Sequence, residues 1–265
     1  MNYKQLAREA RIKVLSMVHK AQTSHIASNF SVIDVATVIY NNLKENDLVF
    51  WSKGWAAASV YYFLAKQGQF PYEDLDKFPN KPYLALAETY VNGVLVSGGS
   101  MGHGLPVAVG AALAKKKAKE KGMVYCIMGD GEMQEGTTWE AAQIAAHHKL
   151  NNLIVLVDYN KWSAMGLTND ICNLEPFEDR WKGFNWGTNR IDGHNYEAIS
   201  DAISYTLGSS APSVIICDTI KGKGVSFFEN PPEHKDMGDT GHLYHYKYID
   251  EDLYNKALAE LNEKL

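Results

Sequence analysis

The stretch of sequence that decides the fold runs from Met123 to Trp162: MVYCIMGDGEMQEGTTWEAAQIAAHHKLNNLIVLVDYNKW. It opens with the apolar run Val124–Met128, which is typical of a buried strand and stops at a Gly-Asp-Gly tripeptide. A helical pattern begins at about Thr137. A second buried strand, Leu153–Val157, then precedes Asp158-Tyr159-Asn160. The stretch therefore predicts a strand–helix–strand unit with parallel strands and a right-handed crossover.

Polar side chains follow both predicted strands. Asp130 and Asn160 lie just beyond the carboxyl ends of the strands, the edge at which open α/β sheets bind ligands. They offer one charged and one neutral oxygen. Mg²⁺ binds a few such protein oxygens and completes its coordination shell with substrate phosphates. Gly129 and Gly131 would let a diphosphate approach the backbone closely, and the helix after Gly136 adds free N–H groups. Taken alone, however, the Gly-Asp-Gly tripeptide is also what a tight turn looks like.

The whole stretch resembles the thiamine diphosphate motif, which begins with GDG and ends with Asn. Its extended form, GDGEMQEGTTWEAAQIAAHHKLNNLIVLVDYN, is similar to the transketolase family. The resemblance implies thiamine diphosphate and Mg²⁺ as cofactors. Its metal ligands would be Asp130, Asn160 and the backbone carbonyl of Trp162, with Glu132 and the two flanking glycines, Gly129 and Gly131, also at the cofactor.

The resemblance covers nearly the whole chain of 265 residues. It implies one thiamine diphosphate-binding domain over residues 1–265, of the type that binds the diphosphate. We therefore expect an α/β fold, in which a doubly wound, mostly parallel sheet carries helices on both faces. The chain corresponds to only the first third to half of a full transketolase.

Further motifs of the family supply candidate site residues. His25, in a small polar segment before a helix expected over 32–41, resembles the histidine that lines the substrate channel near the cofactor's reactive carbon. In SGGSMGHGLP, residues 97–106, the family loop holds the cofactor rings. Lys221, in KGKGVSFFEN, falls where the family places a lysine near the aminopyrimidine. The matching loop residues are Gly99, Ser100, Met101 and His103.

Two departures from the family pattern affect residues with an expected role. The family's SKGH segment ends here in Trp55, and tryptophan accepts no proton and donates only through its indole N–H. We expect Trp55 to reshape the substrate channel, the alternative being that it only packs in the core. The family's WHG segment, whose histidine contacts the diphosphate, is matched only in part, because the Trp and the Gly are missing. His234 is the best match, and His242 and His245 are the alternatives.

No stretch resembles the pyrimidine domain, whose glutamate activates the cofactor at N1′. Glu135 matches the family glutamate that hydrogen-bonds this partner glutamate, and two adjacent buried carboxylates readily share a proton. The resemblance therefore implies a partner, a C-terminal transketolase-like subunit that carries the pyrimidine domain. We expect a heterotetramer of two such chains with two partners, which acts on a sugar or sugar phosphate.

Three functions remain open on these grounds. The leading one is transfer of a two-carbon ketol unit between a ketose and an aldose, with His25, His103, Glu135 and Lys221 as catalytic residues. The second is acyl transfer from a 2-oxo acid such as pyruvate to an aldehyde or keto sugar. The third is a non-catalytic regulatory subunit. A dinucleotide-binding domain is least favoured, because no G-x-G-x-x-G follows a strand.

Composition limits the partners and the compartment. A net charge of −5 without a basic stripe argues against nucleic acid. Neither a signal peptide nor a membrane span is visible, which makes the cytoplasm the expected location. Cys126 and Cys217 lie in apolar strand patterns and are expected to be inert core thiols. Residues 165–190 are rich in aromatic side chains and suggest either a lid or, more strongly, a packed interface; the aromatic residues are Phe177, Trp181, Phe184 and Trp186.

Overall fold

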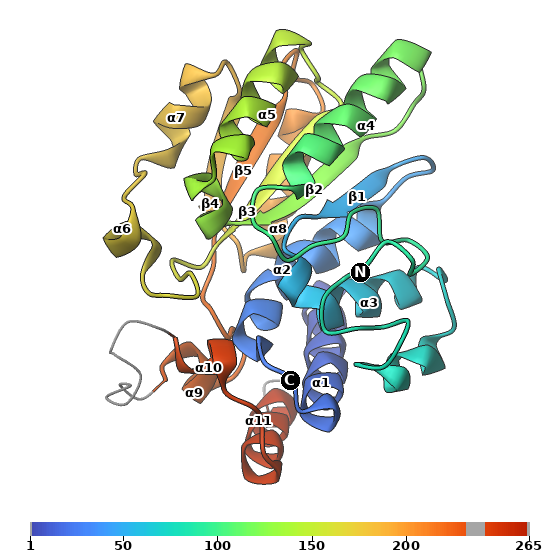
Figure 1. Cartoon of the computed structure of the whole chain (residues 1–265), viewed down its shortest axis with the longest axis vertical. Coiled ribbons are helices and arrows are strands. Elements are labelled where there is room, and N and C mark those ends of the chain that lie inside the picture. Colours follow the sequence, from blue (N-terminus) through green and yellow to red (C-terminus); the bar gives the residue numbers. More distant parts are fainter. Residues whose placement is uncertain (1, 232–241, 264–265) are drawn as a thin grey trace.

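A parallel β-sheet runs through the centre of the molecule. The computed structural model describes residues 2–231 and 242–263, and Figure 1 shows the chain. Within these residues five strands pair in the order β1-β2-β3-β5-β4, and each pair is parallel. The predicted fold class is confirmed. The strands are β1 (Leu48–Trp51), β2 (Val124–Gly129), β3 (Leu153–Tyr159), β4 (Gly187–Asp192) and β5 (Ser213–Asp218).

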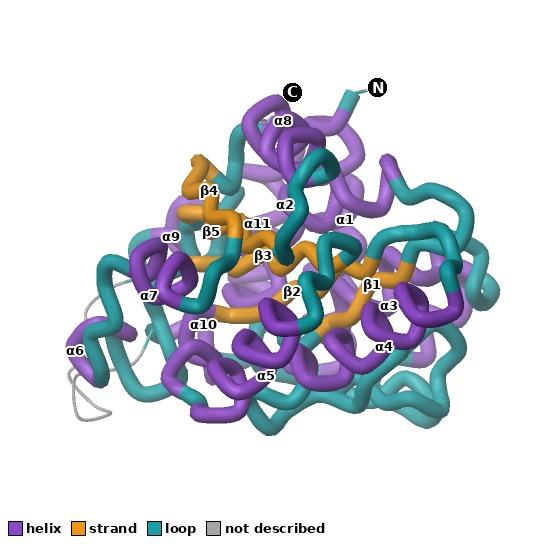
Figure 2. Tube along the Cα trace, turned by 90° about the horizontal axis from the view of Figure 1, so that it is seen from above, coloured by secondary structure: helices purple, strands orange, loops and turns teal. Residues whose placement is uncertain are grey.

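Helices cover both faces of this sheet, as the view from above shows (Figure 2). Alternate residues of the strands point to opposite faces, so Tyr125 and Ile127 join one core cluster and Cys126 and Met128 the other. The first face is covered by α1 (Tyr3–Ala21), α2 (Ile26–Asn42), α3 (Ala57–Lys66) and α8 (Tyr196–Thr206). The second is covered by α4 (Gly104–Ala118), α5 (Gly136–His147) and α7 (Phe177–Gly183).

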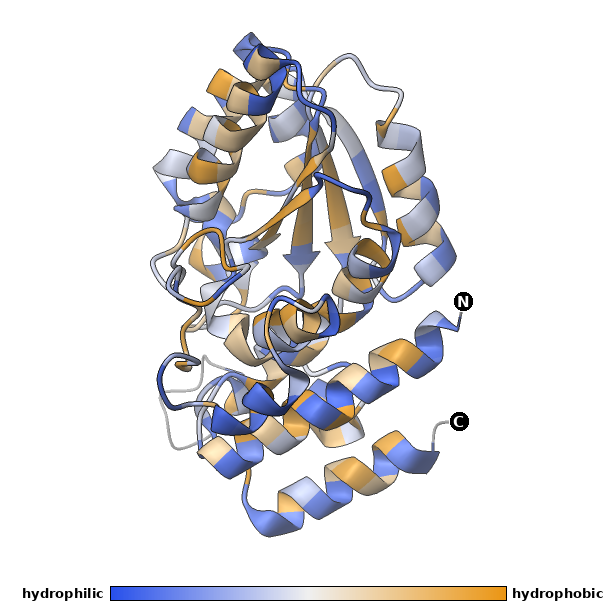
Figure 3. Cartoon of the chain, turned by 90° about the vertical axis from the view of Figure 1, so that its right-hand side faces the viewer, coloured by the Kyte–Doolittle hydropathy of each residue, from blue (hydrophilic) through white to orange (hydrophobic). Residues whose placement is uncertain are grey.

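Short elements complete the chain around this framework. The helix α11 (Glu251–Glu263) packs against α1, and both outer helices alternate polar and apolar residues (Figure 3). The remaining helices have three to six residues and connect the larger elements. They are η1 (Gly54–Ala56), η2 (Tyr72–Lys77), η3 (Asp130–Gln134), α6 (Thr168–Ile171), α9 (Ser226–Glu229) and α10 (Leu243–Tyr246).

The second helix begins six residues earlier than the sequence predicts, at Ile26 instead of Val32. Its first turns contain polar residues that look like a loop, but these side chains are buried and hydrogen-bonded. Asn29 donates to the carbonyl of His25 (2.9 Å), and Ser31 donates to Asp158 (2.6 Å). The helix is therefore buried on all sides, a position that removes the amphipathic signal.

The aromatic residues of 165–190 belong to the chain's own core, so their interpretation as an interface is wrong. Phe177 and Trp181 are fully buried, and Trp186 is nearly so. The indole N–H of Trp186 donates to the carbonyl of Ala142 in α5 (2.9 Å). These rings anchor α7 to the sheet face that α5 also covers. The predicted burial of Cys126 and Cys217 is confirmed, and this burial raises the pKa of both thiols.

A buried polar network ties the first face to the carboxyl edge of the sheet. Asp34 of α2 accepts hydrogen bonds from Arg11, from His194 (2.7 Å) and from Tyr196 (2.8 Å). The other ring nitrogen of His194 accepts from the backbone N–H of Ile220 (2.8 Å). Although burial acts to raise it, the Arg11 charge holds the pKa of Asp34 well below its usual range. The network thus fixes the turn that follows β5.

Candidate functional site

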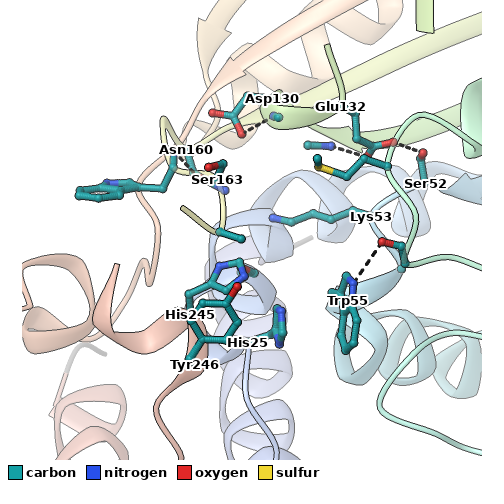
Figure 4. A pocket seen from close by; sticks show the side chains of 18 residues that line it. His25, Ser52, Lys53, Trp55, Asp130, Glu132, Asn160, Ser163, His245 and Tyr246 are labelled. Carbon is teal, nitrogen blue, oxygen red and sulfur yellow. Dashed lines mark hydrogen bonds between the residues drawn. The ribbon is translucent and has the colours of Figure 1, made fainter. Parts of the chain in front are cut away.

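A cavity of about 350 Å³ opens at the carboxyl edge of the sheet. Its lining comes from the loops after β1, β2 and β3, from the start of α2, and from the C-terminal segment (Figure 4). This is the edge at which the sequence predicts a ligand. The lining residues are His25, Ser28, Ser52, Lys53, Gly54, Trp55, Gly99, Met101, Gly129, Asp130, Gly131, Glu132, Asn160, Trp162, Ser163, Ala164, His245 and Tyr246.

The sheet side of this cavity carries a buried carboxylate, Asp130, at the start of η3. It accepts hydrogen bonds from the backbone N–H of Lys161 (2.8 Å), from the hydroxyl of Thr168 (2.9 Å) and from the N–H of Gly131 (3.0 Å). Burial, together with the nearby Asp158, raises the pKa of Asp130 to about 6. Among residues 2–231 and 242–263, none forms an ion pair with this carboxylate. The charges of Lys53 and Lys221 act on it only from outside ion-pair distance. A buried carboxylate without a paired cation fits a metal ligand.

Asn160 lies beside Asp130, and its amide is held in a fixed orientation. Its Nδ2 donates to Asp158 (3.2 Å) and its Oδ1 accepts from the backbone N–H of Trp162 (3.1 Å). Within the described part of the chain no group of three or more His, Cys, Asp or Glu side chains could hold a metal. The residues that the transketolase resemblance suggests as ligands would offer one carboxylate, one amide oxygen and one backbone carbonyl, a set of hard oxygens that fits Mg²⁺ and not zinc.

Asp158 forms an ion pair with Lys53, which lines the cavity. Lys53 Nζ contacts the Asp158 carboxylate, which also accepts from Ser31 and from Thr219 (2.5 Å). Burial would raise the pKa of Asp158, but the Lys53 charge and these hydrogen bonds lower it. The loop after β1 is thereby tied to β3 and to α2. The sequence pointed to the Ser-Lys-Gly segment but assigned no role to Lys53 or Asp158.

Glu132 fixes the walls of the cavity to one another. Its carboxylate accepts hydrogen bonds from the hydroxyl of Ser52, from the N–H of Gly102 (3.2 Å) and from the N–H of Gly129 (2.9 Å). Burial raises the pKa of Glu132. Three loops that are distant in sequence therefore meet at one side chain, which positions the cavity walls.

The side of the cavity opposite the sheet is a cluster of four rings. His25 stacks on Trp55 with 4.6 Å between ring centroids, and it lies 4.4 Å from His245 and 6.0 Å from Tyr246. His25 caps α2 in the left-handed region, with φ of 71°. Its backbone N–H donates to the carbonyl of His245 (2.9 Å). Figure 4 shows these rings facing the acidic side across Lys53.

Lys221 lies behind the lining and is almost completely buried. Its Nζ donates to the carbonyl of Ser163 (3.3 Å) and lies 3.0 Å from Nδ1 of His245. Burial, with the nearby Lys53 charge, lowers the pKa of Lys221 to about 7. The side chain thus joins the loop after β3 to the C-terminal segment.

Comparison with known proteins decides the family. Residues 2–237 match the family model described as the thiamine diphosphate-binding domain of transketolase. The chain belongs to the transketolase family. It is 35% identical to a 6-deoxy-6-sulfo-D-fructose transketolase subunit, SqwG, of Clostridium sp. (strain MSTE9), over 94% of this chain and 92% of that protein. It is 34% identical to an apulose-4-phosphate transketolase subunit of Actinobacillus succinogenes, over 91% of this chain and 88% of that protein.

Solved transketolase structures share the fold. The transketolase of Campylobacter jejuni superposes with a TM-score of 0.87 at 27% identity, over 99% of this chain and 43% of that one. A transketolase of Leishmania mexicana gives the same TM-score at 21% identity and is a likeness of fold alone. The chain is a transketolase-like enzyme subunit, since its family and its subunit relatives are transketolases. None of the described helices is long and apolar enough to cross a membrane.

The structure brings together most, but not all, of the site residues expected from the transketolase resemblance. Ser100 and His103 are exposed and do not line the cavity, and Glu135 is half-buried beside Gly102. His234, the preferred match for the diphosphate histidine, lies outside the described residues. Its alternative His245 lines the cavity. The expected residues that line the cavity are His25, Gly99, Met101, Gly129, Asp130, Gly131, Glu132, Asn160 and Trp162.

The structure also shows where Trp55 and His242 lie. Trp55 is 43% exposed at the cavity, so the interpretation that it only packs in the core is wrong. His242 is buried, with its ring 5.5 Å from that of Trp162. No sequence signal identified Tyr246, because the segment that carries it departs from the transketolase pattern.

Acid is expected to destabilise the cofactor-free chain between pH 6.5 and pH 4. Burial and the Lys221 charge lower the pKa of His25 from 6.5 to about 4. Below pH 6.5 the unfolded chain therefore binds a proton at this residue that the folded chain does not, and stability falls with pH. Between pH 6.5 and 5, His25 should contribute a loss of about 1–2 kcal/mol in the free energy of unfolding. Urea unfolding at several pH values measures this loss. His25→Asn should flatten the plot of the free energy of unfolding against pH. Parallel curves for the two proteins would contradict the assignment.

Proposed function

We propose that this chain is the cofactor-binding subunit of a two-chain transketolase that transfers a two-carbon ketol unit from a ketose to an aldose. The observation that carries the proposal is the buried Asp130 carboxylate, which forms no ion pair with the described residues and shares one cavity with Asn160 and the ring cluster. A metal–diphosphate group fits the sheet side of the cavity, which carries Asp130 and Asn160. The reacting sugar fits the ring side opposite. The two subunit relatives support a separate partner chain.

The residues of the sheet side would hold the cofactor. Asp130, the Oδ1 of Asn160 and the carbonyl of Trp162 supply the oxygens for Mg²⁺. Gly129 and Gly131 leave room for a diphosphate at the backbone. In the structure a Cβ on Gly131 would lie 3.4 Å from the Met101 sulfur, so a side chain here would fill the space between the backbone and the cavity wall. Thiamine diphosphate, when bound, supplies the chemistry that breaks and forms the carbon–carbon bonds.

The ring side would handle protons of the substrate. The hydroxyl of Ser24 lies 2.6 Å from Nδ1 of His25 and donates to it when that ring carries its proton on Nε2. The pKa of His25, lowered to about 4 by burial and by Lys221, keeps the ring neutral near pH 7. A neutral ring with a fixed tautomer can both accept and return a proton from a sugar hydroxyl. His245 contacts His25 and lies 3.0 Å from Lys221 Nζ, so it belongs to this ring side.

Assembly tests the proposal. The purified chain should bind thiamine diphosphate weakly and show no turnover, because the carboxylate that activates N1′ belongs to the pyrimidine domain of the partner. Adding the partner subunit should create ketol transfer that requires thiamine diphosphate and Mg²⁺. The mass of the active species should equal two chains with two partners, as measured by sedimentation. Full turnover by this chain alone would show the proposal to be mistaken.

Glu135 allows a sharper test in the assembled enzyme. We propose that its carboxylate meets the activating glutamate of the partner, so Glu135→Ala should lower kcat by about 100-fold, the range of a lost acid–base interaction. Glu140→Ala, which removes an exposed glutamate of α5, is the matched control and should keep wild-type activity. Sedimentation should give the same assembly for both variants. Equal kcat for Glu135→Ala and the control would remove Glu135 from the mechanism.

A further inference from the structure

Trp55 presents an unusual surface at the cavity. It is 43% exposed while it lines the cavity, so its indole ring is accessible to a ligand. Its single polar atom, Nε1, donates to the backbone carbonyl of Gly99 (3.2 Å). Tryptophan has no other hydrogen-bonding group. What this side chain offers to a ligand is therefore carbon and hydrogen alone.

Neighbouring backbone and side chains fix the orientation of the Trp55 indole. The preceding residue, Gly54, is so close to Gly98 that a Cβ on Gly54 would overlap the Gly98 Cα. This approach fixes the backbone on one side of Trp55, and the bond to Gly99 fixes the far end of its ring. The ring also stacks on His25, at an interplanar angle of 10°. Ligand binding cannot rotate Trp55 away without breaking these contacts.

The rings that surround Trp55 are uncharged, and Lys53 is the cation that lines the same cavity among the described residues. His25 packs against the face of Trp55, and His245 and Tyr246 continue the cluster. Burial, with the charges of Lys221 and Lys53, lowers the pKa of His25 to about 4, so the stacked imidazole is neutral near pH 7. The acidic groups that line the cavity, Asp130 and Glu132, lie across it on the sheet side (Figure 4).

We propose that Trp55 is a specificity-determining residue that lets the enzyme accept donors whose two-carbon unit ends in a methyl group as well as in a hydroxymethyl group. The inference rests on the proposed transketolase function and deepens it. A site that hydrogen-bonds a substrate hydroxyl rejects the analogue without it by roughly 10⁴–10⁵, whereas an apolar surface discriminates by about 10² at most. The indole of Trp55 has no free hydrogen-bonding group, so this position offers no partner to the terminal hydroxyl of a donor. A donor that ends in a methyl group is therefore not rejected here.

A pair of 2-oxo acids isolates this effect. Pyruvate and hydroxypyruvate differ only in the terminal hydroxyl. With either donor the C1–C2 bond breaks and CO₂ leaves. The C2 carbon then bonds to the carbonyl carbon of an aldehyde acceptor, and the aldehyde oxygen takes one proton from solvent to become a hydroxyl. No oxidant or reductant is consumed, so CO₂ release and the hydroxyketone product report the same event.

The experiment compares kcat/KM for the two donors, with glycolaldehyde as acceptor, in the enzyme assembled with its partner subunit. Trp55→His and Trp55→Gln place a polar group at the wall and should lower the pyruvate-to-hydroxypyruvate ratio by at least about tenfold. Trp55→Phe keeps a carbon surface and should hold the ratio within about threefold of wild type. Tyr205→His is the matched control, because Tyr205 is an exposed aromatic residue outside the cavity lining.

Each outcome decides the proposal. It is overturned if the polar variants keep the wild-type ratio, or if the wild-type enzyme turns over hydroxypyruvate but not pyruvate. Calorimetry with thiamine diphosphate and Mg²⁺ shows that each variant still forms the cofactor site. Loss of one polar variant to misfolding leaves the other as the test. An assembled wild-type enzyme that binds the cofactor but uses neither 2-oxo acid nor ketose refutes the proposed function itself, and the role of Trp55 with it.

Discussion

Asp130→Ala is expected to lower the affinity for thiamine diphosphate in the presence of Mg²⁺ by at least about 100-fold, which corresponds to about 2.7 kcal/mol. The substitution removes the only charged oxygen of the three proposed metal ligands. The fold should survive, because the raised pKa of about 6 shows that burial disfavours this charge in the cofactor-free chain. Isothermal calorimetry measures the affinity, and circular dichroism checks the fold.

Two companion variants separate charge from shape at this position. Asp130→Asn keeps the size and the oxygen of the side chain but removes its charge, so it should lose most of the same affinity. Asp170→Ala removes an exposed acidic residue of α6, outside the cavity lining, and should leave the affinity unchanged. Wild-type affinity in Asp130→Ala would place the metal elsewhere.

Asp158→Ala should destabilise the fold more than any change in the cavity lining. The substitution leaves the ammonium of Lys53 largely buried, with 12% of its side chain exposed, and without its carboxylate. Removing one partner of a buried ion pair costs about 3–5 kcal/mol. Ser31 and Thr219 also lose an acceptor. Urea unfolding at pH 7 measures the change in the free energy of unfolding.

A second substitution distinguishes the stranded charge from the lost hydrogen bonds. Lys53→Met in the Asp158→Ala background removes the unpaired ammonium and should recover about half of the lost stability. Lys53→Met alone should cost less than Asp158→Ala, because the remaining carboxylate keeps the hydroxyls of Ser31 and Thr219. Additive effects of the two single changes would show that the pair contributes no coupling.

The sheet and the acidic half of the cavity could be predicted because their signals are local. Two apolar runs end in Gly-Asp-Gly and in Asp-Tyr-Asn, and parallel strands bring their carboxyl ends to one edge. The position of Asp130 beside Asn160 follows from that topology. The Gly-Asp-Gly tripeptide alone could equally be a tight turn without a ligand. Only the length of the stretch that resembles the family motif favoured the cofactor site.

The rest of the site depends on long-range packing, which a sequence pattern does not carry. The start of α2 was missed because its polar side chains are satisfied inside the protein by partners such as Asp158. The roles of Lys53 and Glu132 depend on partners far along the chain. His245 was only an alternative, because an unusual segment precedes it. The aromatic residues near α7 were assigned to an interface, since a sequence shows that they need burial but not what buries them.

The span of the cavity along the chain has a consequence for biosynthesis. Its lining begins at His25 and ends at Tyr246. A nascent polypeptide therefore cannot form the ring wall until the ribosome has released nearly all of these residues, although β1, β2 and β3 can already pair. Closure of the cavity is then a late event, in which the segment that carries His245 and Tyr246 completes the wall. Truncation before Leu243 should leave a folded sheet that cannot retain its cofactor.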